Sequence, residues 1–188
     1  TNNTEVPQTA NRPTAFCMGA TAQACKQAGI QIETEEPTDN IQRRKMGIYL
    51  GAGEGAVDTA PFFNVLINAW DDDNNEMDYK KWGEYAFKHF TGMNELEQEP
   101  IMPASHIAMM TGARGPSRSC LTACAASTQA IGEAAMMIRQ GKADIMIAGG
   151  AHSMIHPLGV MGISRLTALS TRNDSPPTAS RPFTASTD

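Results

Sequence analysis

The sequence predicts an α/β fold in which helices and strands form layers. Two apolar runs, residues 46–51 (MGIYLG) and 143–150 (ADIMIAGG), are continuous, as strands buried on both faces require. Residues 125–140, which precede the second run, carry small and apolar side chains at helical spacing. This alternation of strand and helix is typical of layered α/β proteins.

A polar leader and one helix open the chain. Residues 1–13 are polar and proline-containing, so we expect a loose leading segment followed by a single domain at 14–188. Apolar and small residues recur at helical spacing over 14–28, and Gly29 is expected to cap that helix at its C-terminal end.

The next segment is charged and amphipathic. The strand at 46–51 ends in glycines, which is typical of a strand that leads into a tight turn. Residues 58–93 contain both tryptophans and the acidic patch 71–73. We expect helical pieces here, with the acidic patch on a solvated loop.

The region after Pro103 alternates helix and strand around a cysteine. Ser105 is expected to cap a helix that ends at Thr111, and residues 117–124 are predicted to form a strand that ends at Cys124.

The remaining elements follow Cys124 directly. The helix at 125–140 should bury one face and end at Gly141. The strand at 143–150 and a helix around 159–169 come next, followed by a polar, proline-rich tail. The predicted buried face of the first helix consists of Ile131, Ala134, Ala135 and Ile138.

Composition excludes several classes of protein. The net charge of -5 disfavours a nucleic-acid partner, because phosphate binding requires a basic face. No apolar run approaches the roughly 18 residues needed to span a membrane. The 4 cysteines form neither a CxxC pair nor a dense framework, which favours reduced thiols and a cytoplasmic protein.

Cys124 is the candidate nucleophile. It lies in LTACAAS, where the predicted strand turns into a helix of small residues. Unpaired backbone N–H groups and the positive end of the helix dipole favour a thiolate over a thiol at such a position. The same N–H groups can stabilise an oxyanion when a thioester is attacked. A buried, purely structural thiol is the alternative that spacing alone leaves open.

Three weaker signals have simpler explanations. The glycine-rich GAGEG at 51–55 lacks the Lys-Ser/Thr of a phosphate-binding loop and is better explained as a tight turn. Cysteines and histidines four residues apart (Cys120 with Cys124, His152 with His156) suggest a metal site only if both pairs lie on helices, so we expect none. The methionines are best explained as adaptable packing.

The string from Gly115 to Phe183 resembles the nucleophile region of the 3-oxoacyl-[acyl-carrier-protein] synthases, the beta-ketoacyl synthases of fatty acid and polyketide synthesis. TAC followed by small residues, ADxMxAGG, PL, ALSTRND and ASRPF occur in the family's order. Similarity upstream, from TAFCMGATAQACKQAGI through MGIYLGAGEG, is weaker, and residues 57–103 resemble the family poorly.

The resemblance implies a thiolase-like layered fold, of which this chain holds mostly the amino-terminal half, truncated at both ends. It also implies that Cys124 accepts an acyl group from an acyl carrier protein thioester. Decarboxylation of malonyl-carrier protein then gives a carbanion that attacks the acyl-cysteine. No bound cofactor is implied, because phosphopantetheine on the carrier delivers the substrate.

The family's two catalytic histidines have no match in this sequence. His89, His106, His152 and His156 lie in none of the family's histidine motifs. We therefore expect the chain alone to be inactive in condensation and to expose apolar surface that the second half would cover. The resemblance implies a homodimer for the intact enzyme.

By the same resemblance, Met154, Gly159 and Ile163 fall where family members line the acyl pocket; core packing is the alternative for these side chains. Arg114 and Arg118 are candidates for contact with an acidic carrier protein, or are solvated surface. Two other functions stay open: a coenzyme A-dependent thiolase-like condensing enzyme, and a non-condensing partner subunit that shapes chain length. Retention of Cys124 argues against the second.

Overall fold

The computed structural model describes residues 10–30, 32, 43–52, 59–181 and 183. Contacts divide the chain into two compact units, Thr1–His152 and Ser153–Asp188. Residues 1–9 of the leader predicted at 1–13, and most of GAGEG, lie outside the described residues.

A three-stranded parallel sheet forms the centre of the first unit. Its strands are β1 (Met46–Ala52), β4 (Ser117–Cys120) and β5 (Ile145–Ala151), in the order β4-β1-β5. β1 is buried along its whole length because it pairs on both sides. The two strands predicted from continuous apolar runs are confirmed, although β5 is only half-buried because it lies at the edge of the described sheet.

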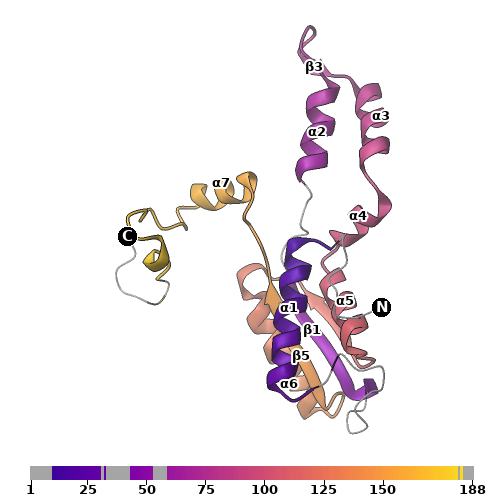
Figure 1. Cartoon of the computed structure of the whole chain (residues 1–188), viewed down its shortest axis with the longest axis vertical. Helices are drawn as coiled ribbons and strands as arrows, with labels where there is room; N and C mark the ends of the chain where they lie inside the picture. The colour runs from indigo at the N-terminus through magenta and orange to yellow at the C-terminus, as the bar shows by residue number, and fades with distance from the viewer. Residues whose placement is uncertain (1–9, 31, 33–42, 53–58, 182, 184–188) are drawn as a thin grey trace. The chain divides into compact units, whose positions relative to one another are not determined.

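Helices cover both faces of this sheet (Figure 1). Helix α6 (Ala126–Arg139) packs its buried small residues against Tyr49 on one face. Helices α1 (Arg12–Gln27) and α5 (Met102–Thr111) pack against Ile48 and Leu50 on the other. Alternate residues of β1 thus serve the two cores, as the two-residue period of a strand dictates.

Two predicted helix starts in the first unit are wrong by a few residues. Helix α1 begins at Arg12 rather than Thr14, because the Asn11 side chain accepts a hydrogen bond from the Thr14 N–H at 2.9 Å and proline fits the first turn. Ser105 is not a cap: α5 begins at Met102, and the Ser105 hydroxyl donates back to the Ile101 carbonyl inside the helix.

The two predicted glycine ends are confirmed. Gly29 and Gly141 follow α1 and α6 with φ of 71° and 69°. At Gly29 the Ile30 N–H reaches back to the Cys25 carbonyl at 2.8 Å, the bond pattern of a Schellman cap.

The predicted buried face of α6 is partly wrong. Ile131 and Ile138 are 53% and 42% exposed, and Ala134 is the predicted residue that is buried. The residues of α6 that pack on the sheet are Ala126, Ala130, Ala134 and Met137. The helix approaches the sheet through its small side chains, and its branched side chains face outward.

The segment between β1 and β4 contains a helical hairpin. Helices α2 (Thr59–Ala69) and α3 (Tyr79–His89) pack on each other and are joined by the short antiparallel strands β2 (Trp70–Asp71) and β3 (Glu76–Met77). Asp72 and Asp73 of the acidic patch lie in the turn, as predicted, whereas Asp71 ends β2; the two strands were not predicted.

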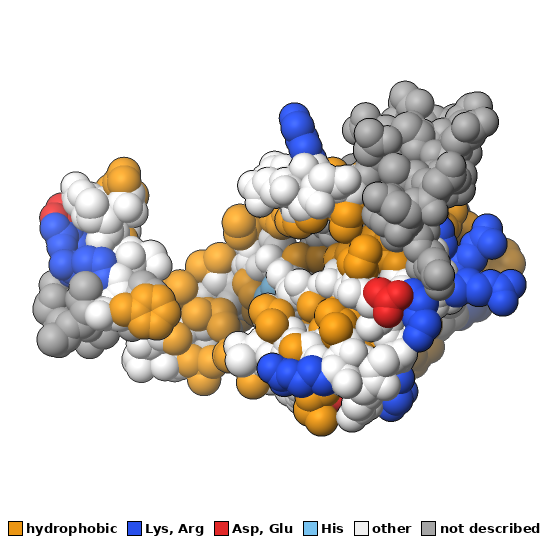
Figure 2. Space-filling model, turned by 90° about the horizontal axis from the view of Figure 1, so that it is seen from below, with side chains coloured by type: hydrophobic (Ala, Val, Ile, Leu, Met, Phe, Trp, Pro, Cys, Tyr) orange, Lys and Arg blue, Asp and Glu red, His pale blue; other side chains and the backbone are white. Residues whose placement is uncertain are grey.

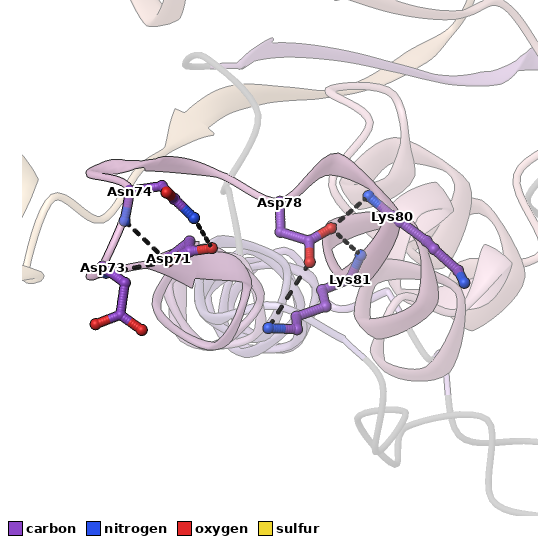
Figure 3. Close-up of polar contacts among 6 residues, drawn as sticks. All are labelled: Asp71, Asp73, Asn74, Asp78, Lys80 and Lys81. Carbon is purple, nitrogen blue, oxygen red and sulfur yellow. Dashed lines mark hydrogen bonds and ion pairs between the residues drawn. The ribbon is translucent and has the colours of Figure 1, made fainter.

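Carboxylates hold this turn and start the next helix (Figure 3). Asp71 accepts hydrogen bonds from the Asp73 and Asn74 N–H groups and from the Asn74 side-chain amide. Asp78 caps α3 by accepting from the N–H groups of Lys80 and Lys81, both at 3.0 Å. These bonds lower the pKa of both carboxyl groups, since they favour the charged form.

The remaining elements are short. The first unit also contains the 3₁₀ turn η1 (Arg43–Lys45) and helix α4 (Gly92–Glu97). In the second unit, α7 (Pro157–Arg165) begins two residues before the predicted 159–169 and ends four residues earlier, and the His156 side chain caps it. A 3₁₀ turn, η3 (Pro176–Thr178), follows.

Apolar side chains reach the surface in both units (Figure 2). Phe87 is 93% exposed, Met109 73% and Ile67 70%, so apolar side chains are exposed as expected, and their cover by a second half stays a prediction. Among the described residues, every helix is too short or too polar to cross a membrane.

Candidate functional site

Cys124 lies in a turn between the sheet and α6. Strand β4 ends at Cys120, four residues before the predicted end, and its last pair with β1 is Gly51–Cys120. The chain then passes through the 3₁₀ turn η2 (Ala123–Ala125) into α6. In this turn the Cys124 side chain is exposed, whereas Cys17, Cys25 and Cys120 are buried.

The backbone just before Cys124 is strained. Ala123 has a φ of 49°, a left-handed conformation that residues with a side chain rarely adopt. The turn is closed by hydrogen bonds from the Ala125 N–H to the Thr122 carbonyl at 3.1 Å and from the Ala126 N–H to the Ala123 carbonyl. Such strain at a single residue recurs where a side chain must be presented to a ligand.

The helix start that follows Cys124 has no side-chain cap. Neither Thr122, which precedes η2, nor Ala125, which precedes α6, accepts a hydrogen bond from the first turn through its side chain. The Thr122 hydroxyl instead donates to the Gln129 side chain at 2.9 Å. Apart from the Ala125 and Ala126 N–H groups, which close the turn, an uncapped helix start offers N–H donors and a positive dipole end to a nearby negative charge. The turn can therefore stabilise a thiolate or an oxyanion.

The sheet contacts the start of α6 through one small residue from each of its three strands. These residues are register partners and lie side by side: Cys120, Gly51 and Gly150. The Cys120 thiol donates to the Ala126 carbonyl at 3.4 Å, and Gly51 lies against the Ala126–Ser127 peptide. This row, here called the glycine row, was not predicted. Its signal was the glycine at the carboxyl end of each apolar run.

The predicted pocket residues lie in the second unit. Met154 and Ile163 are half-buried and Gly159 is buried. Gly159 packs on the Met154 carbonyl and donates its N–H to the His156 ring at 3.1 Å. The structure groups Met154 and Gly159 locally, while their relation to Cys124 stays a prediction.

A separate groove of about 340 Å³ lies between α1 and β5. Cys17 and Cys25 line it, whereas Cys124 is not among its lining residues. Burial raises the pKa of both thiols, and the nearby Arg43 guanidinium partly offsets the rise at Cys25. Both thiols are therefore poorly suited to act as nucleophiles.

One buried polar pair was missed by sequence reasoning. The His106 Nε2 lies 2.9 Å from both carboxylate oxygens of Glu97, and the two residues are 8% and 3% exposed. His106 is thereby engaged in the packing of α4 against α5. The part of the chain that the structure describes contains no cluster of three or more potential metal ligands.

Comparison with known proteins places the chain in a family. The family model "Beta-ketoacyl synthase, N-terminal domain" matches residues 6–187. The chain is 34% identical over 168 residues to 3-oxoacyl-[acyl-carrier-protein] synthase 2 of Vibrio harveyi, covering 89% of this chain and 35% of that protein.

Other curated relatives give the same result. A mitochondrial 3-oxoacyl-[acyl-carrier-protein] synthase of Arabidopsis thaliana is 48% identical over 88 residues, which cover 46% of this chain and 19% of that protein. A synthase 2 of Staphylococcus aureus is 31% identical, with 92% and 36% covered. The chain thus spans well under half the length of these relatives.

Solved structures confirm the α/β, thiolase-like layered fold. A beta-ketoacyl synthase from Burkholderia phymatum matches with a TM-score of 0.67 and 25% identity over 95% of this chain and 40% of that chain. A type II polyketide ketosynthase in complex with its acyl-carrier protein matches at 0.64 and 23% identity, covering 88% of this chain and 36% of that one. With an exposed cysteine in its TAC motif at the start of an uncapped helix, the chain belongs to the beta-ketoacyl synthase family, whose N-terminal domain it carries.

Proposed function

We propose that Cys124 is the acyl acceptor of a 3-oxoacyl-[acyl-carrier-protein] synthase. The thiolate attacks the carbonyl carbon of an acyl thioester, a new carbon–sulfur bond forms, and the oxyanion collapses to break the old carbon–sulfur bond. The carrier's phosphopantetheine leaves as a thiolate, which takes a proton from water. The N–H groups of the first turn of α6 hydrogen-bond the oxyanion while it exists.

The placement of Cys124 is the observation that supports this proposal most. It is the exposed cysteine of the four, and it precedes a helix start whose N–H groups no side chain caps. Cys17 and Cys25 line a groove, and burial raises the pKa of both thiols. The Cys120 thiol donates a hydrogen bond to a backbone carbonyl. The relatives' names supply the reaction class.

The second half of the proposed reaction is decarboxylative condensation. The acyl-cysteine is attacked by the carbanion that malonyl-carrier protein yields when it loses carbon dioxide, so that a carbon–carbon bond replaces the carbon–sulfur bond. Two described histidines have other roles here: His106 pairs with Glu97, and His156 caps α7. We therefore assign neither of them to this step.

The proposed partners are an acyl carrier protein and a second copy of the protein. Arg114 precedes β4 and Arg118 lies within it; both are exposed, so they can meet an acidic carrier. Two cellular locations are possible. The cysteine content of the sequence favours the cytoplasm, whereas the Arabidopsis relative is named as mitochondrial. Cellular location and dimer formation stay predictions.

Acyl transfer to Cys124 tests the proposal. The chain is incubated with a short-chain acyl-pantetheine thioester, and intact-mass and peptide mapping locate the acyl group. We expect a single acyl group on Cys124 and none on Cys124→Ala.

A synthetic peptide of residues 121–127 serves as the reference for the intrinsic reactivity of the thiol. Cys124 in the folded chain is expected to react with iodoacetamide at least about tenfold faster than in the peptide, because only the folded chain supplies the helix start. Equal iodoacetamide rates in the folded chain and the peptide, together with no acyl transfer, would show that Cys124 is a structural thiol. Acyl transfer from coenzyme A thioesters in preference to pantetheine thioesters would favour the thiolase-like alternative.

A further inference from the structure

The first turn of α6 lies directly on backbone atoms of the sheet, with no side chain between them. If Gly51 carried a Cβ, that atom would meet the carbonyl carbon of Ala126, lie 2.5 Å from the Ser127 nitrogen and lie 2.6 Å from the Ala126 oxygen. These are backbone atoms of the helix, so no rotamer change can relieve the contact.

Gly150 continues this contact from the neighbouring strand. A Cβ there would lie 2.9 Å from the Gly51 carbonyl oxygen and 3.0 Å from the Ser127 Cβ. On the other side of Gly51, the Cys120 thiol bonds to the Ala126 carbonyl at 3.4 Å. The glycine row therefore touches Ala126 and Ser127, which come two and three residues after Cys124.

The contact fixes the geometry of the reactive turn. Ala123, with its φ of 49°, and the hydrogen bonds that close η2 link the end of β4 to the start of α6 over a few residues. A helix lifted by a side chain at Gly51 carries the first-turn N–H groups away from the sheet and breaks this closed turn. A shift of about 1 Å in such a site can reduce a rate about a hundredfold.

We propose that Gly51 and Gly150 are positioning residues for Cys124. Because neither has a Cβ, the first turn of α6 can lie close enough to the sheet for its N–H groups to be aligned with the thiol. This inference rests on the proposed role of Cys124 as the acyl acceptor. The inference assigns a function to the ends of β1 and β5. Gly51 and Gly150 contact Ala126 and Ser127 of the helix, and they act on the Cys124 thiol through that helix.

Two other glycines provide matched controls. Gly47, at the opposite end of β1, is also crowded: a Cβ would lie 2.7 Å from the Pro116 carbonyl oxygen and 2.5 Å from the Met146 sulfur. Gly132, within α6, has nothing within 4 Å of an ideal Cβ. Gly47→Ala therefore disturbs the sheet away from Cys124, and Gly132→Ala changes the helix without crowding it.

The experiment compares the four variants Gly51→Ala, Gly150→Ala, Gly47→Ala and Gly132→Ala with the unaltered chain. Folding is monitored by circular dichroism and urea unfolding, and the Cys124 iodoacetamide rate is measured relative to the 121–127 peptide. Gly51→Ala should slow Cys124 about tenfold or more and Gly150→Ala by less, because a methyl group at Gly51 would lie 2.5 Å from the Ser127 nitrogen, whereas one at Gly150 would lie 3.4 Å from the Ser127 Cα. Gly47→Ala and Gly132→Ala should leave the Cys124 rate within about twofold, even where Gly47→Ala lowers stability.

A rescue separates positioning from stability. Ser127→Gly removes the Cβ that would lie 3.0 Å from the new methyl group of Gly150→Ala, so combining the two substitutions should restore part of the Cys124 rate. Should Gly51→Ala prevent folding, Gly150→Ala and its rescue decide the question. An unchanged rate in folded Gly51→Ala, or equal slowing in Gly47→Ala, would overturn the inference.

The outcome distinguishes this inference from the proposed function. If Cys124 in the unaltered chain reacts no faster than the peptide, the proposed function fails. Amide hydrogen exchange at 126–128 still tests the glycine row in that case: faster exchange in Gly51→Ala than in Gly47→Ala supports the contact, and equal exchange contradicts it.

Discussion

At the scale of single residues, the left-handed Ala123 determines how Cys124 leaves the sheet. Its φ of 49° turns the chain between the last paired residue of β4 and the first turn of α6. For a residue with a Cβ this conformation costs about 1–2 kcal/mol, and a branched Cβ raises the cost. The surrounding bonds must hold the residue there.

Ala123→Val is therefore expected to lower the free energy of unfolding by about 1–3 kcal/mol. Ala125→Val is the matched control, because Ala125 lies in the same exposed turn with an ordinary φ of -87°. Urea unfolding followed by circular dichroism measures both. Equal losses for the two variants would mean that the left-handed backbone is not the source of the effect.

At the scale of elements, a buried pair joins α4 to α5. Glu97 ends α4 and places both carboxylate oxygens 2.9 Å from the His106 Nε2 of α5. The Glu97 carbonyl also accepts from the Asn11 side chain at 2.6 Å, and Asn11 caps α1. One residue thus ties three helices together.

Because a buried polar group without its partner is costly, His106→Ala should lower the free energy of unfolding by about 3 kcal/mol. Replacing both residues by Ala should cost less than the sum of the two single losses, since neither partner is then left alone. Urea unfolding of the two single variants and the double variant measures this coupling. Strict additivity, or a loss below about 1 kcal/mol in His106→Ala, would contradict a structural role for the pair.

The same elements show what sequence could predict. The strands at 46–51 and 143–150 and the glycine ends at Gly29 and Gly141 were found because their signals are local. The end of β4 was misplaced because the sequence does not show where the pairing with a neighbouring strand stops. The buried face of α6 was misjudged because its small residues pack against Tyr49 and Cys120, which becomes visible only once the strands are placed in the sheet.

At the scale of the whole molecule, the chain forms two compact units that hold different parts of the predicted site. Cys124 lies in the first unit, Thr1–His152, and the predicted pocket residues lie in the second, Ser153–Asp188. The family and the nucleophile could be predicted because one contiguous motif carries both. Pocket lining could not be settled in this way, because it depends on contacts between distant parts of the fold.

Stability of the whole molecule should decrease at alkaline pH. Burial raises the pKa of Cys17 and Cys25 above the ordinary value of 9.0 and raises that of Tyr49, with a smaller contribution from Glu133, above 10.0. The unfolded chain therefore loses these protons at lower pH than the folded chain does. Their contribution to stability is fully present below about pH 9 and is lost as pH rises through the higher folded values.

Urea unfolding at about pH 8 and about pH 10.5 should show this loss as a lower midpoint at the higher pH. Replacing Cys17 and Cys25 together by Ala should reduce the dependence on pH, whatever it does to stability at neutral pH, because two of the three groups whose pKa burial raises are then absent. Gly132→Ala, which changes helix α6 alone, should keep the full dependence. A midpoint that stays constant or rises with pH in the unaltered chain would show that these groups do not keep their protons through burial in the folded state.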